Sequence, residues 1–147
     1  MQTGSCLCGA VAYEIAGPLA GVQLCHCSQC RRASGTAFAA NLPVDVANFR
    51  ILRGADRLKS FESSPGKERL FCEGCGSPII SRAASAPGWV RVRAGTLDEP
   101  AETHAAFRFH TASNVAWLPI TDDLPRYPDD RPKASSPAGG GVSPRAD

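Results

Sequence analysis

The stretch Cys25-His26-Cys27-Ser28-Gln29-Cys30 places three cysteines within six residues and determines how the rest of the chain is interpreted. Two shorter pairs flank it, Cys6-Leu7-Cys8 before it and Cys72-Glu73-Gly74-Cys75 after it, so that all seven cysteines fall into clusters. Short loops that present two thiolates to one ion are typical of zinc sites, and a cluster of three exceeds half of a four-ligand site. The spacing therefore predicts one closed four-thiolate site and one three-thiolate site with a free coordination position.

The two outer pairs are predicted to bind one ion together, with Cys6, Cys8, Cys72 and Cys75 as its ligands. A glycine follows the second cysteine of each pair, which lets the backbone turn sharply and direct N–H groups toward sulfur. Two alternatives stay open: these cysteines are small buried hydrophobic residues, or they form disulfides. The regular spacing and the odd number of cysteines favour the metal site over both.

The middle cluster, formed by Cys25, Cys27 and Cys30, is the candidate reactive site. Structural zinc sites are closed, whereas catalytic zinc sites keep a position open for water or substrate. The alternative is a second structural site that a histidine completes, with His26 nearest in sequence and His104 and His110 more distant. In extended backbone His26 points away from both neighbouring cysteines, which favours a supporting role over direct ligation.

Two arginines, Arg31 and Arg32, follow the middle cluster directly. A guanidinium group binds a carboxylate through two parallel hydrogen bonds, so either residue is a candidate for holding an anionic substrate. The alternatives are a solvated surface, or compensation of the thiolate charge, for which Arg69 is a further candidate. The sequence leaves these roles open.

Composition narrows the class of protein. With 16 basic and 14 acidic residues, the charge is too balanced to favour a nucleic-acid partner. No apolar run approaches the roughly 20 residues that span a bilayer, and no signal-peptide pattern precedes Cys6. Seven cysteines without a secretion signal suit a reducing compartment. We therefore expect a cytoplasmic protein with no membrane partner, and exposed strand edges that are compatible with a homodimer.

Short apolar segments bounded by Gly, Pro, Asp or Ser predict a mainly β fold with little helix. The predicted strands are 11–15, 37–42, 49–52, 58–61, 68–71, 78–82, 89–94, 105–109 and 115–118. One helical turn is expected at 28–34, with Ser28 as N-cap and Gly35 as its end. Residues 1–127 are predicted to form one domain, and the Pro/Gly/Ser-rich segment 128–147 is predicted to be disordered.

These motifs resemble the glutathione-dependent formaldehyde-activating enzyme (GFA) family, whose domain the centromere protein V group shares. The resemblance covers about residues 4–127. It is carried by Gly4–Val11, Cys25–Gly35, Phe71–Pro78, Ala94–Asp98, Trp117 and Asp122–Tyr127.

The resemblance implies a β-tent fold of small antiparallel sheets pinned by zinc. It implies two zinc ions per chain: a structural one on Cys6, Cys8, Cys72 and Cys75, and a second one on Cys25, Cys27 and Cys30. It also implies carbon–sulfur lyase activity, the reversible condensation of formaldehyde with glutathione to S-hydroxymethylglutathione. The metal ligands that it implies divide the cysteines as the ligand arithmetic does.

Our first hypothesis is an enzyme in which a small thiol such as glutathione reaches the open position and adds to an aldehyde. Arg31 or Arg32 would hold a substrate carboxylate, and His26 and His104 are the candidates for a general acid. The alternatives are a binding module with two structural zincs, or a thiol-binding protein without turnover. A fourth protein ligand at the middle cluster would favour the binding module.

Overall fold

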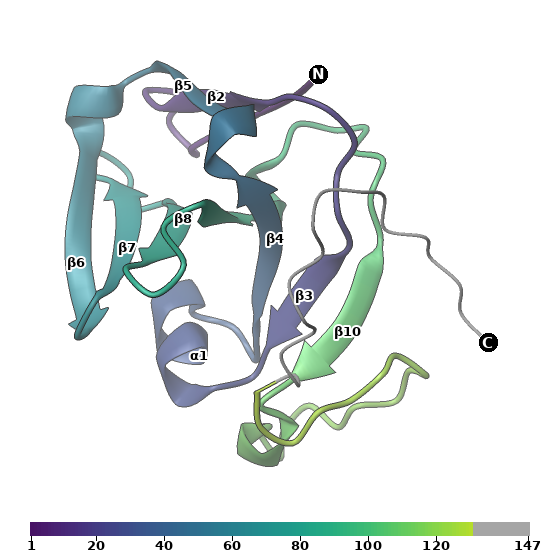
Figure 1. Cartoon of the computed structure of the whole chain (residues 1–147). Helices are drawn as coiled ribbons and strands as arrows, with labels where there is room; N and C mark the ends of the chain where they lie inside the picture. The colour runs from purple at the N-terminus through teal and green to yellow at the C-terminus, as the bar shows by residue number, and fades with distance from the viewer. Residues whose placement is uncertain (131–147) are drawn as a thin grey trace.

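The computed structural model describes residues 1–130, which form two β-sheets and one α-helix (Figure 1). The strands are β1 (Gln2–Ser5), β2 (Ala12–Ile15), β3 (Val22–Cys25), β4 (Ala39–Asp45), β5 (Phe49–Arg53), β6 (Leu58–Ser64), β7 (Lys67–Cys72), β8 (Pro78–Ala83), β9 (Trp89–Arg93) and β10 (Ala105–Phe109). The α-helix is α1 (Ser28–Ser34), and the 3₁₀ turns are η1 (Val46–Asn48), η2 (Ala55–Arg57), η3 (Ala94–Thr96) and η4 (Thr111–Ser113). The predicted mainly β class with little helix is confirmed.

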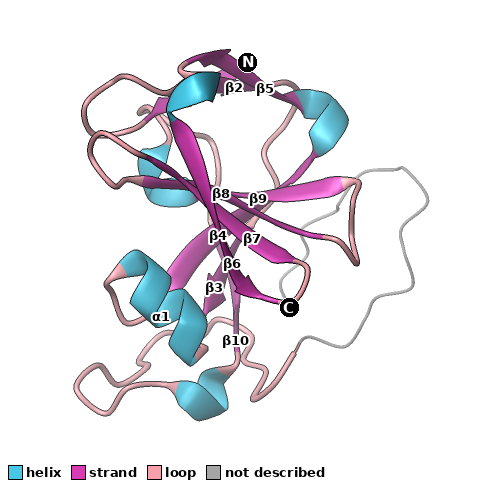
Figure 2. Ribbon diagram, turned by 90° about the vertical axis from the view of Figure 1, so that its left-hand side faces the viewer, coloured by secondary structure: helices cyan, strands magenta, loops and turns pink. Residues whose placement is uncertain are grey.

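The smaller sheet has the strand order β1-β2-β5 and the larger one β10-β3-β4-β9-β8-β7-β6. All neighbouring strands are antiparallel except β10 and β3, which run parallel, so the expectation of antiparallel sheets fails at this edge. The small sheet lies at one end of the large sheet and α1 near the other end, as both views show (Figure 1, Figure 2). Within residues 1–130, no helix combines the length and the apolar composition needed to cross a membrane.

Two predicted details are wrong, and two strands were not predicted. The segment 115–118 forms a turn rather than a strand, because the Leu118 backbone N–H bonds back to the Val115 carbonyl and its own carbonyl accepts from Asn114 Nδ2. The helix N-cap is Cys27 instead of Ser28: the Cys27 sulfur accepts a hydrogen bond from the Cys30 backbone N–H at 3.3 Å. The strands β1 and β3 were not expected, because the first is polar and the second runs into the cysteine cluster.

The main core lies between the two sheets and contains fully buried side chains such as Tyr13, Leu42 and Ile79. Burying an aliphatic or aromatic side chain of this size contributes roughly 1.5–3 kcal/mol. Two cysteines of the outer pairs, Cys6 and Cys72, belong to this core. The middle cysteines instead form a small separate apolar group around Cys25, Cys30 and Ala39. The outer cluster is therefore anchored in the main core through two of its four cysteines, whereas the middle cluster lies beside that core.

The predicted helix stop is confirmed, since Gly35 has φ 69° and its N–H bonds to the Arg31 carbonyl at 2.8 Å. Part of the predicted tail, residues 131–147, lies outside the described residues. The first three tail residues are described, and the carbonyls of Pro128 and Asp129 accept hydrogen bonds from Ala112 and His110. The domain boundary expected at 127 stays a prediction.

Replacing Gly54 by alanine should destabilise the fold more than the same change at Gly17. Both glycines are left-handed, with φ 74° and 77°. A Cβ at Gly54 would overlap the Ala10 carbonyl oxygen, whereas nothing lies within 4 Å of a Cβ at Gly17. We expect a loss of about 1–2 kcal/mol for Gly17→Ala from backbone strain alone, and about 1–3 kcal/mol more for Gly54→Ala. Urea unfolding of the two variants measures the difference, and equal losses would contradict the steric argument.

Candidate metal centres and the adjoining pocket

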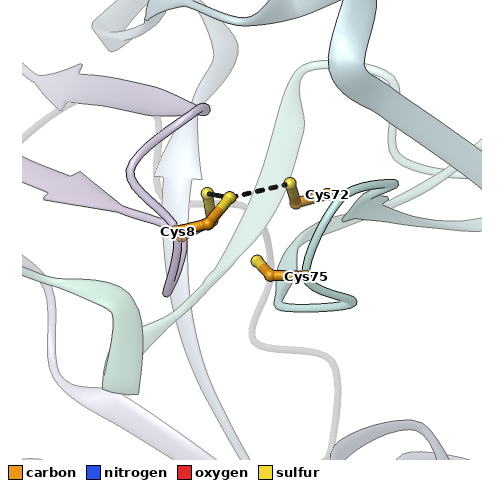
Figure 3. A group of neighbouring side chains, drawn as sticks. Cys8, Cys72 and Cys75 are labelled. Atoms are coloured by element: carbon orange, nitrogen blue, oxygen red, sulfur yellow. Dashed lines mark hydrogen bonds between the residues drawn. The ribbon is translucent and has the colours of Figure 1, made fainter.

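The structure brings the two outer cysteine pairs together. The sulfurs of Cys6, Cys8, Cys72 and Cys75 all lie within 4.8 Å of one another. Figure 3 shows Cys72 and Cys75 on one loop facing Cys8 on another. The sulfur–sulfur distances are 3.6 Å from Cys6 to Cys8 and 3.8 Å from Cys8 to Cys72. A tetrahedral zinc ion with Zn–S bonds of about 2.3 Å separates its sulfurs by about 3.8 Å, so this donor set fits zinc.

Each of the two loops holds its cysteines through backbone turns. In the first loop, the Gly9 N–H bonds to the Cys6 carbonyl, and the Val11 N–H reaches the Cys6 sulfur at 3.3 Å. In the second loop, the Gly76 N–H bonds to the Cys72 carbonyl at 2.8 Å. N–H groups near a sulfur favour the thiolate, which is the form that binds a metal. The glycines that follow each pair thus serve the turn that the sequence predicted.

The middle cysteines also converge: the sulfurs of Cys25, Cys27 and Cys30 lie within 4.8 Å of one another. Cys25 ends β3, Cys27 is the N-cap of α1, and Cys30 lies in the first turn of α1. Among the residues that the structure describes, no histidine, cysteine or carboxylate joins the three sulfurs at that distance. The donor set fits a zinc ion with three protein ligands and an open fourth position, the arrangement typical of catalytic zinc.

The Arg69 side chain compensates the charge of the middle cluster. Its Nη1 and Nη2 atoms each lie 3.9 Å from the Cys30 sulfur. Hydrogen bonds from Cys25 and Cys27, together with the positive charge of Arg69, lower the pKa of Cys30. Arg69 follows the middle cluster by 39 residues and comes from β7, so the sheet rather than the local sequence supplies this cation.

A pocket of about 520 Å³ opens beside the three middle sulfurs. Its volume is in the range of small-molecule sites. Strands from across the large sheet, the turn between β6 and β7 and the loop between β8 and β9 form its walls. The lining comprises the three cysteines together with Gln29, Asn41, Ser64, Pro65, Gly66, Lys67, Arg69, Ser81, Ala83, Ala84, Ser85, Ala86, Arg91, Phe109, His110 and Asp130.

The pocket is strongly cationic on one wall, where Lys67, Arg69 and Arg91 line it. Burial and the nearby charges of Arg91 and Arg69 lower the pKa of Lys67 to about 8. A fourth cation, Arg93, is buried behind the lining, and its Nη1 donates to Asn41 Oδ1. Three crowded cations in one half-enclosed pocket favour an anionic ligand, because an anion relieves their mutual repulsion.

The sequence did not single out Lys67 or Arg91. The signal was the alternation of β9, where Arg91 and Arg93 share one face because strand side chains alternate. Conversely, neither Arg31 nor Arg32 is among the described residues that line the pocket. The Arg31 Nε atom donates to the His26 carbonyl at 3.2 Å, and Arg32 is exposed.

His26 is buried behind the cluster, and both of its ring nitrogens are engaged. Nε2 lies 3.1 Å from Arg108 Nη1, and Nδ1 lies 2.9 Å from Asn114 Oδ1. Arginine has no acceptor, so Nε2 must accept and Nδ1–H must donate. Arg108 is itself fixed by Asp122, at 2.6 and 2.9 Å, and by the Phe38 ring. The neutral ring therefore links the cysteine-bearing segment 25–30, called the metal loop below, to the segment 114–122.

The remaining histidines lie at opposite ends of β10. In the parallel register, Ala105 pairs with Val22 and Phe109 pairs with Cys25. His104 precedes β10 at the end that is distant from the middle cysteines, and it is exposed. His110 follows β10 at the end beside Cys25 and lines the pocket.

Cys72→Ala should destabilise the zinc-loaded domain severely, because it removes one of four ligands, and Cys72 itself is a buried core residue. Structural zinc contributes on the order of 10 kcal/mol to folding, so losing one ligand forfeits several kcal/mol. The matched control is Glu73→Ala on the same loop, which breaks only the exposed ion pairs to Arg57 and Lys59. Thermal melting with zinc analysis tests this, and a Cys72→Ala protein that melts like Glu73→Ala would show that the cluster is not structural.

Comparison with known proteins agrees with the cysteine pattern. The family model described as "Glutathione-dependent formaldehyde-activating enzyme" matches residues 1–113, which include both clusters. A curated relative from Halomonas elongata, named "Putative glutathione-dependent formaldehyde-activating enzyme", is 37% identical over 84 residues, which is 52% of each chain. The chain thus spans about half the length of this relative. A crystal structure of a Rhodobacter sphaeroides protein is similar with a TM-score of 0.58 and 27% identity, over 68% of this chain and 91% of that one. The chain belongs to the glutathione-dependent formaldehyde-activating enzyme family.

Proposed function

We propose that this protein is a zinc-dependent carbon–sulfur lyase that catalyses the reversible addition of glutathione to formaldehyde. One observation carries the proposal: a three-thiol cluster without a fourth described ligand opens directly onto a cationic pocket. Membership of the family supports the same reaction class. A purely structural zinc would need a fourth protein ligand, and residues 1–130 offer none near the three sulfurs.

The residues present fit two zinc ions per chain. Cys25, Cys27 and Cys30 would hold the ion at the pocket, and Cys6, Cys8, Cys72 and Cys75 would hold the structural ion. At the pocket, a bound zinc ion supplies a positive charge that lowers the pKa of a nearby thiol. The chain itself supplies the cationic wall, the positioning of the metal loop and the proton exchange that the reaction requires.

Glutathione carries two carboxylates and one ammonium group, so it is a net anion at neutral pH. We assign its carboxylates to Lys67 and Arg91, because both line the pocket and neither is engaged in an ion pair among the described residues. This replaces the role predicted for Arg31 and Arg32. Arg69 stays beside Cys30 and balances the thiolates.

The reaction needs a sulfur held near a carbonyl carbon. The sulfur electron pair forms the C–S bond, the carbonyl π pair moves onto oxygen, and that oxygen takes up one proton. Holding both reactants in one pocket removes much of the entropic cost of their encounter. In this scheme, His26 positions the cysteine loop and does not touch the substrate, since Arg108 and Asn114 occupy its ring nitrogens.

We further propose that the protein works in a reducing cytoplasm. None of the seven cysteines forms a disulfide, and metal ligation requires reduced sulfurs that can become thiolates. A homodimer stays a prediction, to be tested by sedimentation.

Cys27→Ser should abolish the activity and remove one of two zinc ions while the fold survives, because the middle cluster lies outside the main core. The matched control is Ser28→Ala, at the exposed neighbouring position. Zinc content, thermal melting and the rate of S-hydroxymethylglutathione formation above the uncatalysed rate are the measurements. A Cys27→Ser protein with the parent's rate would refute the proposed site. Glutathione binding without any acceleration in the parent would instead identify a thiol-binding protein.

Arg91→Gln should raise the KM for glutathione about tenfold, since one charge-assisted hydrogen bond contributes roughly 1.5–3 kcal/mol. The control is Arg82→Gln on neighbouring β8, where the arginine is exposed and paired with Glu68. Cysteamine, a thiol without a carboxylate, should be used equally well by the parent and by Arg91→Gln. An equal loss with both thiols would mean that Arg91 supports the fold rather than the substrate carboxylate.

A further inference from the structure

We propose that His110, oriented by Asp130, is the catalytic residue that exchanges a proton with the aldehyde oxygen. This inference rests on the proposed function and supplies the general acid and base that sequence reasoning sought in His26 and His104. Four observations carry it: the place of His110 in the pocket, its backbone, its partner and the unsuitability of the other groups.

The first observation is that His110 stands beside the metal loop although it is 80 or more residues away in sequence. It follows Phe109, which pairs with Cys25 in the parallel ladder, and the Phe109 carbonyl accepts the His26 backbone N–H at 3.0 Å. His110 lines the same pocket as the three cysteines, and its side chain is 30% exposed. A ligand in the pocket can therefore reach both the sulfurs and this ring.

The second observation is the backbone of His110. Within residues 1–130 it is the one non-glycine residue in the left-handed region, with φ 53° and ψ 37°. Such conformations persist where the surroundings fix them, and they cluster at functional sites. Here the surroundings are the segment 127–130: the carbonyls of Tyr127, Pro128 and Asp129 accept the N–H groups of Thr111, Ala112 and His110. The same segment places Asp130 at the pocket.

The third observation is the pairing of the ring. His110 Nε2 lies 2.9 Å from Asp130 Oδ1. An ionised carboxylate only accepts hydrogen bonds, so Nε2 carries the hydrogen and Nδ1 is the nitrogen that gains and loses a proton. A carboxylate that accepts from one ring nitrogen fixes the tautomer and the orientation of the imidazole. His110 and Asp130 therefore have the arrangement of an oriented acid–base pair.

The fourth observation is that the other candidates for the proton-exchanging group have their nitrogens in hydrogen bonds, lie away from the pocket or do not titrate. His26 has both nitrogens engaged, and His104 is exposed beyond the far end of β10. Arginine does not lose its proton in proteins, which excludes Arg69 and Arg91. Lys67 is the remaining titratable cation of the pocket, and the experiment separates it from His110 by their different kinetic effects.

In the forward reaction, the protonated His110 ring gives its proton to the carbonyl oxygen as the C–S bond forms. The thiol releases its proton to water when the thiolate forms, and water reprotonates the ring after the step, so that the net transfer is one proton from sulfur to oxygen per turnover and no redox change occurs. In the reverse reaction, His110 removes the hydroxyl proton as the C–S bond breaks. The same residue thus serves both directions of a reversible addition.

The test compares His110→Gly with His104→Gly in the zinc-loaded protein. Glycine keeps the left-handed backbone of position 110, so the variant is expected to fold. We expect kcat to fall at least about 100-fold in His110→Gly with the KM for glutathione little changed, as is typical for loss of a general acid or base. Free imidazole should restore part of that rate, after subtraction of its effect without protein and with zinc content checked. His104→Gly should match the parent, Asp130→Asn should lose less, and Lys67→Gln should change KM rather than kcat.

A second readout does not depend on turnover. In protein labelled with ¹³C-histidine, glutathione should shift the ring signal that is missing in His110→Gly and leave the His104 signal in place. A parent that does not accelerate the reaction overturns the proposed function and this inference together. An active parent with an equally active His110→Gly, or a kcat loss that imidazole does not relieve, overturns the inference alone.

Discussion

The convergence of four thiols from two distant loops is the constraint on which the rest of the structure depends. Cys6 and Cys72 are buried in the main core, yet each must be a thiolate to bind a metal. Buried like charges at sulfur–sulfur distances below 4 Å are strongly repulsive without a cation between them. With a metal ion on these four sulfurs, folding and metal binding would be one event at this site. A metal ion there would join the loop between β1 and β2 to the loop between β7 and β8, and would so fix the small sheet against the large one.

The same ligand chemistry gives a different result in the middle cluster because its surroundings differ. Cys25, Cys27 and Cys30 lie on β3 and at the start of α1, close together in sequence, so they crosslink no distant segments. Their apolar group is small and opens onto a pocket. Strain or ligand exchange here need not disturb the core. A four-thiolate site anchored in the core and a three-thiolate site beside a pocket are thus suited to stability and to chemistry respectively.

The sequence predicted what local spacing determines and missed what strand pairing determines. The division of the cysteines, the helix 28–34 and most strands follow from residues near one another in the chain. The strand β1 does not, because the polar stretch Gln2–Ser5 is extended only through its pairing with β2. The apolar run 115–118 has the composition of a strand, but its Leu118 N–H and carbonyl form hydrogen bonds within a local turn and not with another strand. Lys67 lies on β7 and Arg91 on β9, and only the pairing of strands in the sheet places both in one pocket. No short sequence motif could therefore predict the cationic wall.

The parallel pairing of β3 and β10 explains why the segment after residue 113 contributes to the middle site, whose three cysteines lie within residues 25–30. The pairing places Phe109 next to Cys25, so whatever follows β10 must pass the metal loop. In that following segment, Asn114 contacts His26, Asp122 contacts Arg108 and Asp130 contacts His110. Each contact fixes a side chain of the metal loop or of β10 and its end. Of these two carboxylates, Asp130 lines the pocket beside the three cysteines, together with His110. In the proposed function, an anionic thiol would bind the cations of β7 and β9, and proton exchange would take place at His110 after β10, so different strands of one sheet would serve binding and proton transfer.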